Sequence, residues 1–331
     1  MTPLIDSTTT ELPQTAKARP AVTRPLAARS FGAYLSLVRP YQWTKNLAVL
    51  APLVFSFHLF DAKLLISALA AVGSFCLISS SVYALNDAID AATDALHPKK
   101  QHRPVASGAI STASAIWCSM TCLAIGLTLS AVVSVPLAGV AATYWLSNLL
   151  YSLAVKRMVL LDVMFVALGF VLRVLGGCVV SRVAPSTWLL LTTFLLALFL
   201  SIAKRHQELL SAAEEPIGKG SRPVLEHYDG KVLDQLLAIT AGLVVITYAL
   251  FTISDYAVER FHSGLLILTV PFVLYGIFRY LHVVHVDQEG EDPAAVLFQD
   301  RPLLVCVMGW ALVCITIIYW PQLTSFMSRG G

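Results

Sequence analysis

The chain has 331 residues, of which 57% are hydrophobic and only 13% are charged. Soluble domains carry about 25% charged residues, so this composition excludes an ordinary soluble domain and indicates an integral membrane protein. The formal net charge of +3 is small, and the lysines and arginines form short clusters between apolar stretches, which excludes a nucleic-acid-binding surface. The six cysteines lie in apolar segments without metal-ligand spacing, and we interpret them as buried hydrophobic residues.

The N-terminal segment, residues 1–30, is rich in threonine, proline and alanine and includes four basic residues. It lacks the apolar core of a cleaved signal peptide. We therefore expect residues 1–30 to form a disordered cytoplasmic tail, followed by one catalytic membrane domain over residues 31–331.

About nine apolar stretches follow, each long enough to cross a hydrocarbon core of ~30 Å as a helix. Their centres lie near residues 53, 72, 123, 144, 170, 195, 245, 268 and 312. Backbone polar groups in lipid must be satisfied within the segment, so such uniformly apolar runs favour helices over the alternating strands of a barrel. The sequence predicts an all-α integral membrane protein with about nine transmembrane helices.

The lysines and arginines predict the orientation of these spans, because basic loops stay on the cytoplasmic side. Eighteen of the 23 basic residues fall on the side that carries the N-terminus. The opposite side holds Lys63, Arg182, Arg260 and Arg329. The longest polar loops, near residues 86–108, 203–232 and 282–301, share the basic side. We expect a cytoplasmic N-terminus, an external C-terminus and entry of charged substrates from the cytoplasm.

The densest polar passage contains Asp87, Asp90 and Asp94 at positions i, i+3 and i+7, with Asn86 adjoining them. This spacing stacks three carboxylates along one face of a helix at the membrane edge. Magnesium prefers oxygen ligands and is commonly held by one or two carboxylates together with substrate phosphates. The pattern favours a Mg²⁺-diphosphate site in which these three aspartates are the catalytic residues. A solvated acidic helix end is the simpler alternative.

A cationic passage follows at residues 97–108, where prolines and a glycine break the helix. The break places Lys100 and Arg103 opposite the acids, where they could neutralise phosphate oxygens that the metal does not reach. Positive-inside topology alone would explain these cations equally well.

A second constellation surrounds the end of the fourth span, with Tyr151, Lys156 and Asp162 flanking a short loop and Arg173 deeper in the next helix. An ionisable side chain inside a span costs a few kcal/mol and usually faces a partner or a water-filled cavity. Asp162 and Arg173 are eleven residues apart, about three helical turns, so we expect both to face the same cavity.

Two further clusters contain candidate cations. Lys204 and Arg205 close the sixth span and open a long loop, where complementing the helix macrodipole is an equally good explanation. Lys45 lies in an aromatic and basic run, residues 39–46, that enters the first span and could serve only as a membrane-interface anchor.

The order NDxxDxxxD followed by HPxKxxRPxxxG, within a nine-span protein, resembles the UbiA superfamily of membrane prenyltransferases. Within the superfamily, the decaprenyl-phosphate phosphoribosyltransferase branch is the most similar. Four stretches carry this resemblance, namely residues 39–46, 86–108, 172–177 and 204–209.

The resemblance implies a UbiA-like helical bundle and a phosphoribosyl diphosphate donor held by Mg²⁺ on Asn86, Asp87, Asp90 and Asp94. The acceptor would be a polyprenyl phosphate. The remaining candidate substrate-binding residues are Lys45, Lys100, Arg103, Tyr151, Lys156, Asp162, Arg173, Lys204 and Arg205. Aromatic prenyltransferases of the superfamily carry a second aspartate-rich motif, of which only Asp162 remains here, and this argues against a prenyl diphosphate donor.

Two other functions stay open at this point. An aromatic prenyltransferase would use the same first motif with a different donor, and a secondary transporter would bury polar residues near the bilayer midplane. As a phosphoribosyltransferase, the protein would lie in a bacterial inner membrane with its active site facing the cytoplasm. Its product would supply a lipid-linked arabinose donor. A homo-oligomer is compatible with the sequence.

Overall fold

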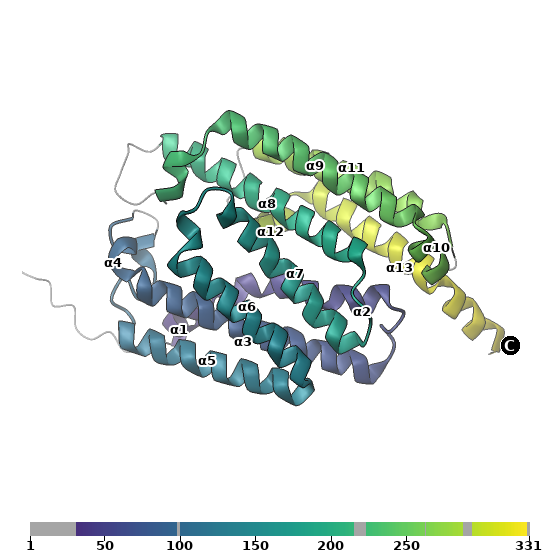
Figure 1. Cartoon of the computed structure of the whole chain (residues 1–331), viewed down its shortest axis with the longest axis horizontal. Coiled ribbons are helices and arrows are strands. Elements are labelled where there is room, and N and C mark those ends of the chain that lie inside the picture. Colours follow the sequence, from purple (N-terminus) through teal and green to yellow (C-terminus); the bar gives the residue numbers. More distant parts are fainter. Residues whose placement is uncertain (1–30, 98–99, 215–222, 262, 287–292, 330–331) are drawn as a thin grey trace, which may run out of the picture.

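The computed structural model describes residues 31–97, 100–214, 223–261, 263–286 and 293–329. Helices connected by short loops make up these described parts of the chain, and they contain no β-strand (Figure 1). The predicted all-α fold is therefore confirmed. The proposed tail, residues 1–30, lies outside the described residues.

The first half of the chain forms a set of helices around α3. Its elements are α1 Phe31–Val38, η1 Pro40–Leu50, α2 Ala51–Phe55, α3 Ala62–Ile89, α4 Ala91–Asp94, η2 Lys100–His102, α5 Thr112–Val133, α6 Val135–Leu153, η3 Val155–Arg157 and α7 Leu161–Ser181. Side-chain caps begin the long helices: Asp61, Ser111 and Ser134 each accept hydrogen bonds from first-turn amides of α3, α5 and α6. Such caps satisfy amides that have no partner within the helix.

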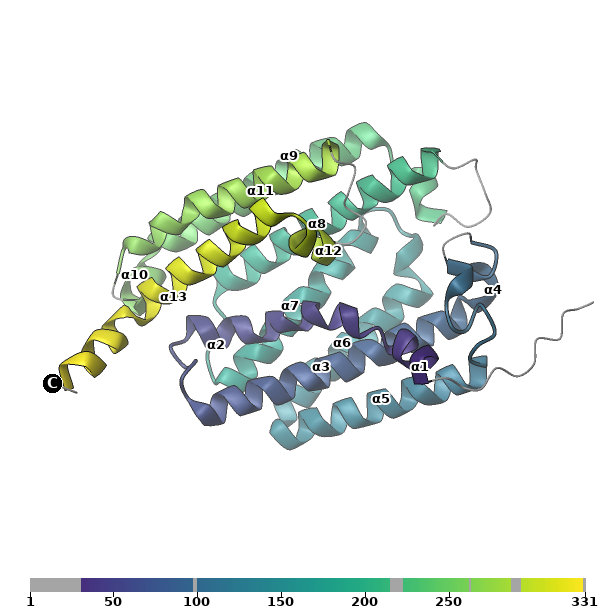
Figure 2. The ribbon, with the colours of Figure 1, turned by 180° about the vertical axis from the view of Figure 1, so that it is seen from behind.

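The second half packs on the other side of α7. Its elements are α8 Thr187–Glu214, η4 Pro223–His227, α9 Gly230–Ile253, α10 Asp255–Phe261, η5 Leu265–Thr269, α11 Val270–His285, α12 Pro293–Gln299 and α13 Arg301–Arg329. One apolar core joins α8, α9 and α11, and a second joins η1, α2, α3, α6 and α7. Helix α7 contacts both halves, so it is the central element of the bundle (Figure 2).

Seven helices in the described part of the chain are long and apolar enough to cross a membrane. They are α3, α5, α7, α8 as far as Ser211, α9, η5 with α11, and α13 as far as Trp320. The two other predicted spans coincide with the η1–α2 segment and with α6. The chain is a multi-pass membrane protein, while the count of nine and the orientation stay predictions.

The η1–α2 segment is short for a span, yet its geometry suits the first predicted one. Eleven residues are in a 3₁₀-helix and five in an α-helix. Because a 3₁₀-helix rises ~2.0 Å per residue and an α-helix ~1.5 Å, the segment reaches about 30 Å, the thickness of the hydrocarbon core. Stretching a short segment in this way compensates for the residues that a regular α-helical span would need.

One end of the bundle, which we call the polar end, carries the polar clusters. It consists of the α3–α4 junction, the η3 turn, the last turns of α8 and the start of α9. Figure 1 shows α4, the end of α8 and the start of α9 at this end, whereas α2, α10 and the C-terminal end of α13 lie at the other. Segments far apart in sequence therefore meet where the sequence predicts a site.

Helix α8 differs from the expectation that its span ends near residue 203. It continues to Glu214, so Lys204 and Arg205 lie inside a helix and do not open a loop. The physical reason is composition, because the segment after the span is rich in alanine, leucine and glutamate, which are strong helix formers.

Gly177 is required for the close approach of α7 to η1 and α2. A Cβ atom at this position would lie 2.1 Å from the carbonyl oxygen of Val49 and 2.9 Å from Cδ of Pro52. We expect Gly177→Ala to lower the free energy of unfolding by about 1–3 kcal/mol or more, because the clash involves backbone. Gly242→Ala in α9 is the matched control, since a Cβ atom there meets nothing within 4 Å. Thermal unfolding in detergent checks both variants, and equal melting temperatures would contradict the packing argument.

Candidate active site

Three aspartates lie where α3 ends and α4 begins. Asp87 is in the last turn of α3, Asp90 joins the two helices, and Asp94 is the last residue of α4. The chain keeps helical hydrogen bonds through the junction, with the Asp90 amide donating to the Asn86 carbonyl and the Asp94 amide to the Asp90 carbonyl. Asp87 and Asp94 are only 1% and 4% exposed. Two of the three carboxylates are thus removed from solvent and need charged or polar partners.

Two arginines supply those partners. Nη2 of Arg39 lies 2.6 Å from Oδ1 of Asp87, and Nη1 of Arg103 lies 3.3 Å from the same oxygen and 2.6 Å from Oδ2 of Asp94. Arg39 sits at the break between α1 and η1 with a φ of 51°, and its guanidinium stacks 5.2 Å from the ring centroid of Tyr83. Arg103 therefore bridges two acids, while Arg39 ties the α1–η1 junction to the end of α3.

The third aspartate has a different partner. Nζ of Lys156, in the η3 turn between α6 and α7, lies 2.8 and 3.0 Å from the two carboxylate oxygens of Asp90. This pair is partly exposed, so its contribution to stability is small. The three acids and their cations come from four segments of the chain, and together we call them the aspartate cluster: Arg39, Asp87, Asp90, Asp94, Arg103 and Lys156.

One oxygen of the aspartate cluster has an unusual environment. Oδ2 of Asp87 is buried and has no hydrogen-bond partner among the described residues, although both arginines approach Oδ1. Buried polar atoms are nearly always hydrogen-bonded, so this carboxylate oxygen calls for a partner beyond the described residues. A hard cation such as Mg²⁺ is the partner that carboxylate oxygens prefer, and the neighbouring acids supply further oxygens. The residues present therefore fit a magnesium ion.

A second polar cluster lies at the start of α7. The fully buried carboxylate of Asp162 accepts hydrogen bonds from Nε of Arg205 at 2.6 Å and from the hydroxyl of Tyr228 at 2.7 Å. Arg205 also pairs with Glu208 and donates to the hydroxyl of Tyr151 at 3.4 Å. Burial, together with the hydrogen bond to Asp162, raises the pKa of Tyr228, so its hydroxyl stays protonated and donating. Both oxygens of Asp162 are thus occupied by protein donors.

Arg173 lies in a separate network deeper in α7. Its Nε donates to Oδ1 of Asn46 at 2.7 Å, Nη1 to the carbonyl of Gly169 at 3.0 Å and Nη2 to the hydroxyl of Tyr144 at 2.7 Å. All three guanidinium nitrogens therefore bond to the protein, and the network links η1, α6 and α7. The described residues show no contact between this network and Asp162, so a common cavity and a role of Arg173 in substrate binding stay predictions.

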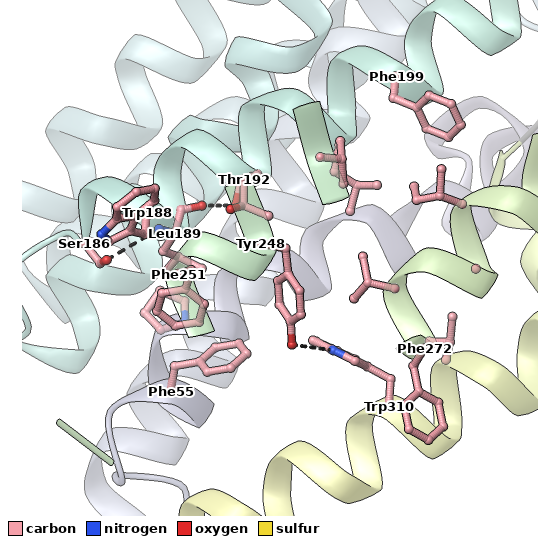
Figure 3. A pocket seen from close by; sticks show the side chains of 18 of the residues that line it. Phe55, Ser186, Trp188, Leu189, Thr192, Phe199, Tyr248, Phe251, Phe272 and Trp310 are labelled. Carbon is pink, nitrogen blue, oxygen red and sulfur yellow. Dashed lines mark hydrogen bonds between the residues drawn. The ribbon is translucent and has the colours of Figure 1, made fainter. Parts of the chain in front are cut away.

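An apolar cavity of about 440 Å³ lies between the helices away from the polar end. Figure 3 shows Trp188, Phe199, Tyr248, Phe251 and Trp310 around it, with the indole of Trp310 donating to the hydroxyl of Tyr248 at 2.8 Å. Phe199 precedes Arg205 on α8 by six residues, about 9 Å along the helix axis. The cavity therefore extends toward the second polar cluster.

The other predicted site residues lie at the polar end or near it. Lys45 is in η1, where its ammonium donates to the side chain of Gln42. Asn86, Lys100 and Lys204 are partly exposed, and their roles, like that of Lys45, stay predictions.

The structure adds three residues that the sequence did not single out as site residues. Arg39 contacts Asp87, and Tyr228 and Glu208 complete the cluster around Asp162. The sequence signal for Arg39 was its place directly before Pro40 at the entry to an apolar segment. Glu208 lies in the stretch 204–209 that carries the family resemblance, whereas Tyr228 gave no signal beyond its position near other polar residues.

The fold and the site define a multi-pass membrane protein with an acid and cation cluster buried at the ends of its helices. The sequence pattern of the UbiA prenyltransferase family matches residues 46–300. The chain belongs to this family, and it is therefore a membrane-embedded transferase.

Relatives and solved structures agree with this assignment. Decaprenyl-phosphate phosphoribosyltransferase of Corynebacterium glutamicum is 32% identical over 291 residues, which are 86% of this chain and 86% of that protein. The protein of the same name from Mycolicibacterium smegmatis is 32% identical and covers 83% of this chain and 89% of its own length. A UbiA homolog from Archaeoglobus fulgidus, solved bound to GPP and Mg²⁺, shares the fold with a TM-score of 0.67 at 19% identity, over 86% of this chain and 99% of that one.

Proposed function

We propose that the protein transfers a 5-phosphoribosyl group from phosphoribosyl diphosphate to a polyprenyl phosphate and releases pyrophosphate. The observation that carries the proposal is the buried Oδ2 of Asp87, which lies beside two arginines and has no hydrogen-bond partner among the described residues. A metal-loaded diphosphate needs carboxylates for the metal and cations for the remaining oxygens, and the aspartate cluster offers both. The names of the relatives that are 32% identical support the phosphoribosyl donor and the polyprenyl phosphate acceptor.

Magnesium would be held by Asp87, Asp90 and Asp94, with Asn86 adjoining them. Bound there, it supplies Lewis-acid charge for the departing pyrophosphate. Arg103 and Lys156 already lie against these acids, so they are placed to pair with donor oxygens that the metal leaves uncovered. The Mg²⁺ in the solved homolog from Archaeoglobus fulgidus supports the same metal for this chain.

The reaction breaks the bond between ribose C1 and a pyrophosphate oxygen and forms a bond between C1 and an oxygen of the lipid phosphate. The lipid phosphate is already an anion at neutral pH, so no strong base is required. Catalysis then depends on holding the two phosphates in line and on stabilising the leaving group, which cations and positioning provide. Arg205 and Lys204 are the candidates for the lipid phosphate, because they lie on α8 at the polar end, within six residues of Phe199, which lines the apolar cavity.

The apolar cavity fits the first isoprene units of a polyprenyl chain. Its walls are aromatic and aliphatic side chains of several spans, and a hydrocarbon chain binds such walls through van der Waals packing. The remaining units would lie in the bilayer. The cavity therefore supports a lipid acceptor whose phosphate faces the polar end.

The wider setting follows from the same reaction. The polar end faces the cytoplasm of a bacterial inner membrane, the N-terminus is cytoplasmic, residues 31–331 form one catalytic domain, and the lipid product feeds a lipid-linked arabinose donor.

An aromatic prenyltransferase would need a second aspartate-rich site, yet both oxygens of Asp162 are taken by Arg205 and Tyr228. Because Lys156 also takes both oxygens of Asp90, occupancy alone does not separate the two clusters, and the missing second aspartate-rich motif is what favours the phosphoribosyl donor.

A substrate test in membranes separates these functions. Membranes containing the chain are given labelled phosphoribosyl diphosphate with a polyprenyl phosphate, or a labelled prenyl diphosphate with an aromatic acceptor. We expect a lipid-soluble labelled product only from the first pair, with loss of turnover on chelation and recovery on addition of Mg²⁺. Consumption of the prenyl diphosphate alone would replace the proposal by the aromatic prenyltransferase. Membranes carrying Asp87→Asn are the negative control.

A further inference from the structure

Three metal-binding side chains meet at the polar end, outside the aspartate cluster. His206 near the end of α8, Asp234 near the start of α9 and His285 at the end of α11 place one ligand atom each within 4.8 Å of one another. Helices α8, α9 and α11 run side by side in both views (Figure 1, Figure 2). The side chain of His206 is 8% exposed, while those of Asp234 and His285 are about half exposed at 50% and 41%. The trio thus joins a buried ligand to two that solvent can reach.

The orientation of His285 defines which of its nitrogens is available. Its Nδ1 lies 2.9 Å from the carbonyl oxygen of Leu281, and a carbonyl only accepts, so Nδ1 carries the hydrogen. In the neutral ring Nε2 then has a lone pair, and it faces Oδ1 of Asp234 at 3.3 Å. Two acceptors in contact need a proton or a metal ion between them. A hydrogen bond from the second ring nitrogen to a backbone carbonyl is also the usual way in which proteins orient a metal-binding histidine.

His206 approaches the same carboxylate oxygen. Its Nε2 lies 2.9 Å from Oδ1 of Asp234, and its buried Nδ1 has no hydrogen-bond partner among the described residues. Two imidazole nitrogens on different helices therefore point at one oxygen. With metal–ligand distances of about 2.0–2.1 Å, the edge between two ligands of a tetrahedral zinc ion is about 3.3 Å. The observed nitrogen–oxygen contacts of 2.9 and 3.3 Å are close to that edge.

We propose that His206, Asp234 and His285 bind a divalent transition-metal ion of the zinc class. The ligand set of two histidines and one carboxylate suits zinc, whereas magnesium prefers oxygen ligands alone. Water completes the coordination at the exposed side. The ion would join α8, α9 and α11 at the polar end. Its ligand His206 directly follows Arg205, whose guanidinium donates a hydrogen bond to Asp162 on α7. The site therefore holds the polar end of the second half in place, and it does not depend on the proposed reaction.

Zinc binding by the purified full chain tests the site. The protein carries an affinity tag without histidines, is stripped with a chelator and is titrated with ZnCl₂ by calorimetry in excess Mg²⁺, which occupies the aspartate cluster. We expect one equivalent of zinc on the wild type, and binding at least about tenfold weaker in His285→Ala and Asp234→Asn, since even second-shell changes cost that much. His282→Ala is the matched control, because it removes an exposed histidine one turn earlier on the same helix and should bind zinc as the wild type does.

A second measurement separates loss of a ligand from loss of the fold. Without zinc, His285→Ala and the wild type should melt at the same temperature, because His285 is exposed. Added zinc should raise the melting temperature of the wild type and of His282→Ala only, because a ligand that binds the folded state stabilises it. The proposal is overturned if the wild type takes up no zinc, or if His285→Ala binds it equally well. In either case the trio is a hydrogen-bonded cluster with a protonated histidine.

Discussion

Asp87→Asn should abolish phosphoribosyl transfer while the protein stays folded and inserted in the membrane. Asparagine keeps an oxygen that can accept from Arg39, so the hydrogen bond to the α1–η1 junction survives. It removes the negative charge and the second carboxylate oxygen, Oδ2, which has no protein partner among the described residues. Metal charge contributes several kcal/mol to such a transition state, and each step of about 1.4 kcal/mol is tenfold in rate. We expect a loss of at least about 1,000-fold in turnover, measured with labelled donor in membranes.

Asp61→Asn is the matched control for this variant. It makes the same chemical change at the other end of α3, where Asp61 caps the helix, and asparagine is an equally good cap. Its activity and melting temperature should equal those of the wild type. Full activity in Asp87→Asn would remove the metal assignment, and so would magnesium binding that is equal in the two variants.

The aspartate cluster could be found from the sequence because its acids are close together in the chain. Asp87, Asp90 and Asp94 form a local pattern, and Arg103 follows within one short loop. Local spacing predicts which side chains share a helix face. It cannot predict that Arg39 returns to the same carboxylate from 48 residues away, because that contact depends on a left-handed backbone at the break before η1.

The second polar cluster shows the same limit. Asp162 and Arg205 were both candidates, but their pairing joins α7 to α8 and spans 43 residues of chain. Tyr228 reaches the same acid across 66 residues, through the packing of η4 against α8. Side-chain pairs of this kind depend on how helices pack against one another. The hydrophobic periodicity of a single sequence does not predict which helices pack together.

At the level of the fold, apolar length was the reliable signal. Seven of the nine predicted spans coincide with helices of the described chain that are both long and apolar enough to cross a bilayer. The sequence did not predict the 3₁₀ geometry of η1. Apolar composition indicates that a segment is buried, but it does not determine the type of helix or its axial rise per residue. It also placed the end of α8 too early, since helix formers carry that helix into the polar region after hydrophobicity ends.

Asp162→Leu should be the most destabilising single substitution at the polar end. It leaves the guanidinium of Arg205, whose side chain is 4% exposed, without its main buried partner. Removing one member of a buried ion pair costs about 3–5 kcal/mol. Glu208 still offsets part of the charge of Arg205, so we expect a loss at the lower end of this range. Lys156→Met, which breaks the partly exposed pair with Asp90, is the stability control and should cost about 1 kcal/mol or less. Thermal unfolding in detergent measures both.

The double variant Asp162→Leu with Arg205→Met separates stability from substrate binding. Replacing both members of a buried pair by apolar residues of similar volume is often neutral, so the melting temperature should return toward that of the wild type. If Arg205 binds the lipid phosphate, this stable double variant should still be inactive, because it lacks the cation. Recovery of both stability and activity would show that the pair only holds α7 against α8, and would remove Arg205 from the substrate site. If Asp162→Leu alone melted at the temperature of the wild type, the buried ion pair with Arg205 would not stabilise the fold.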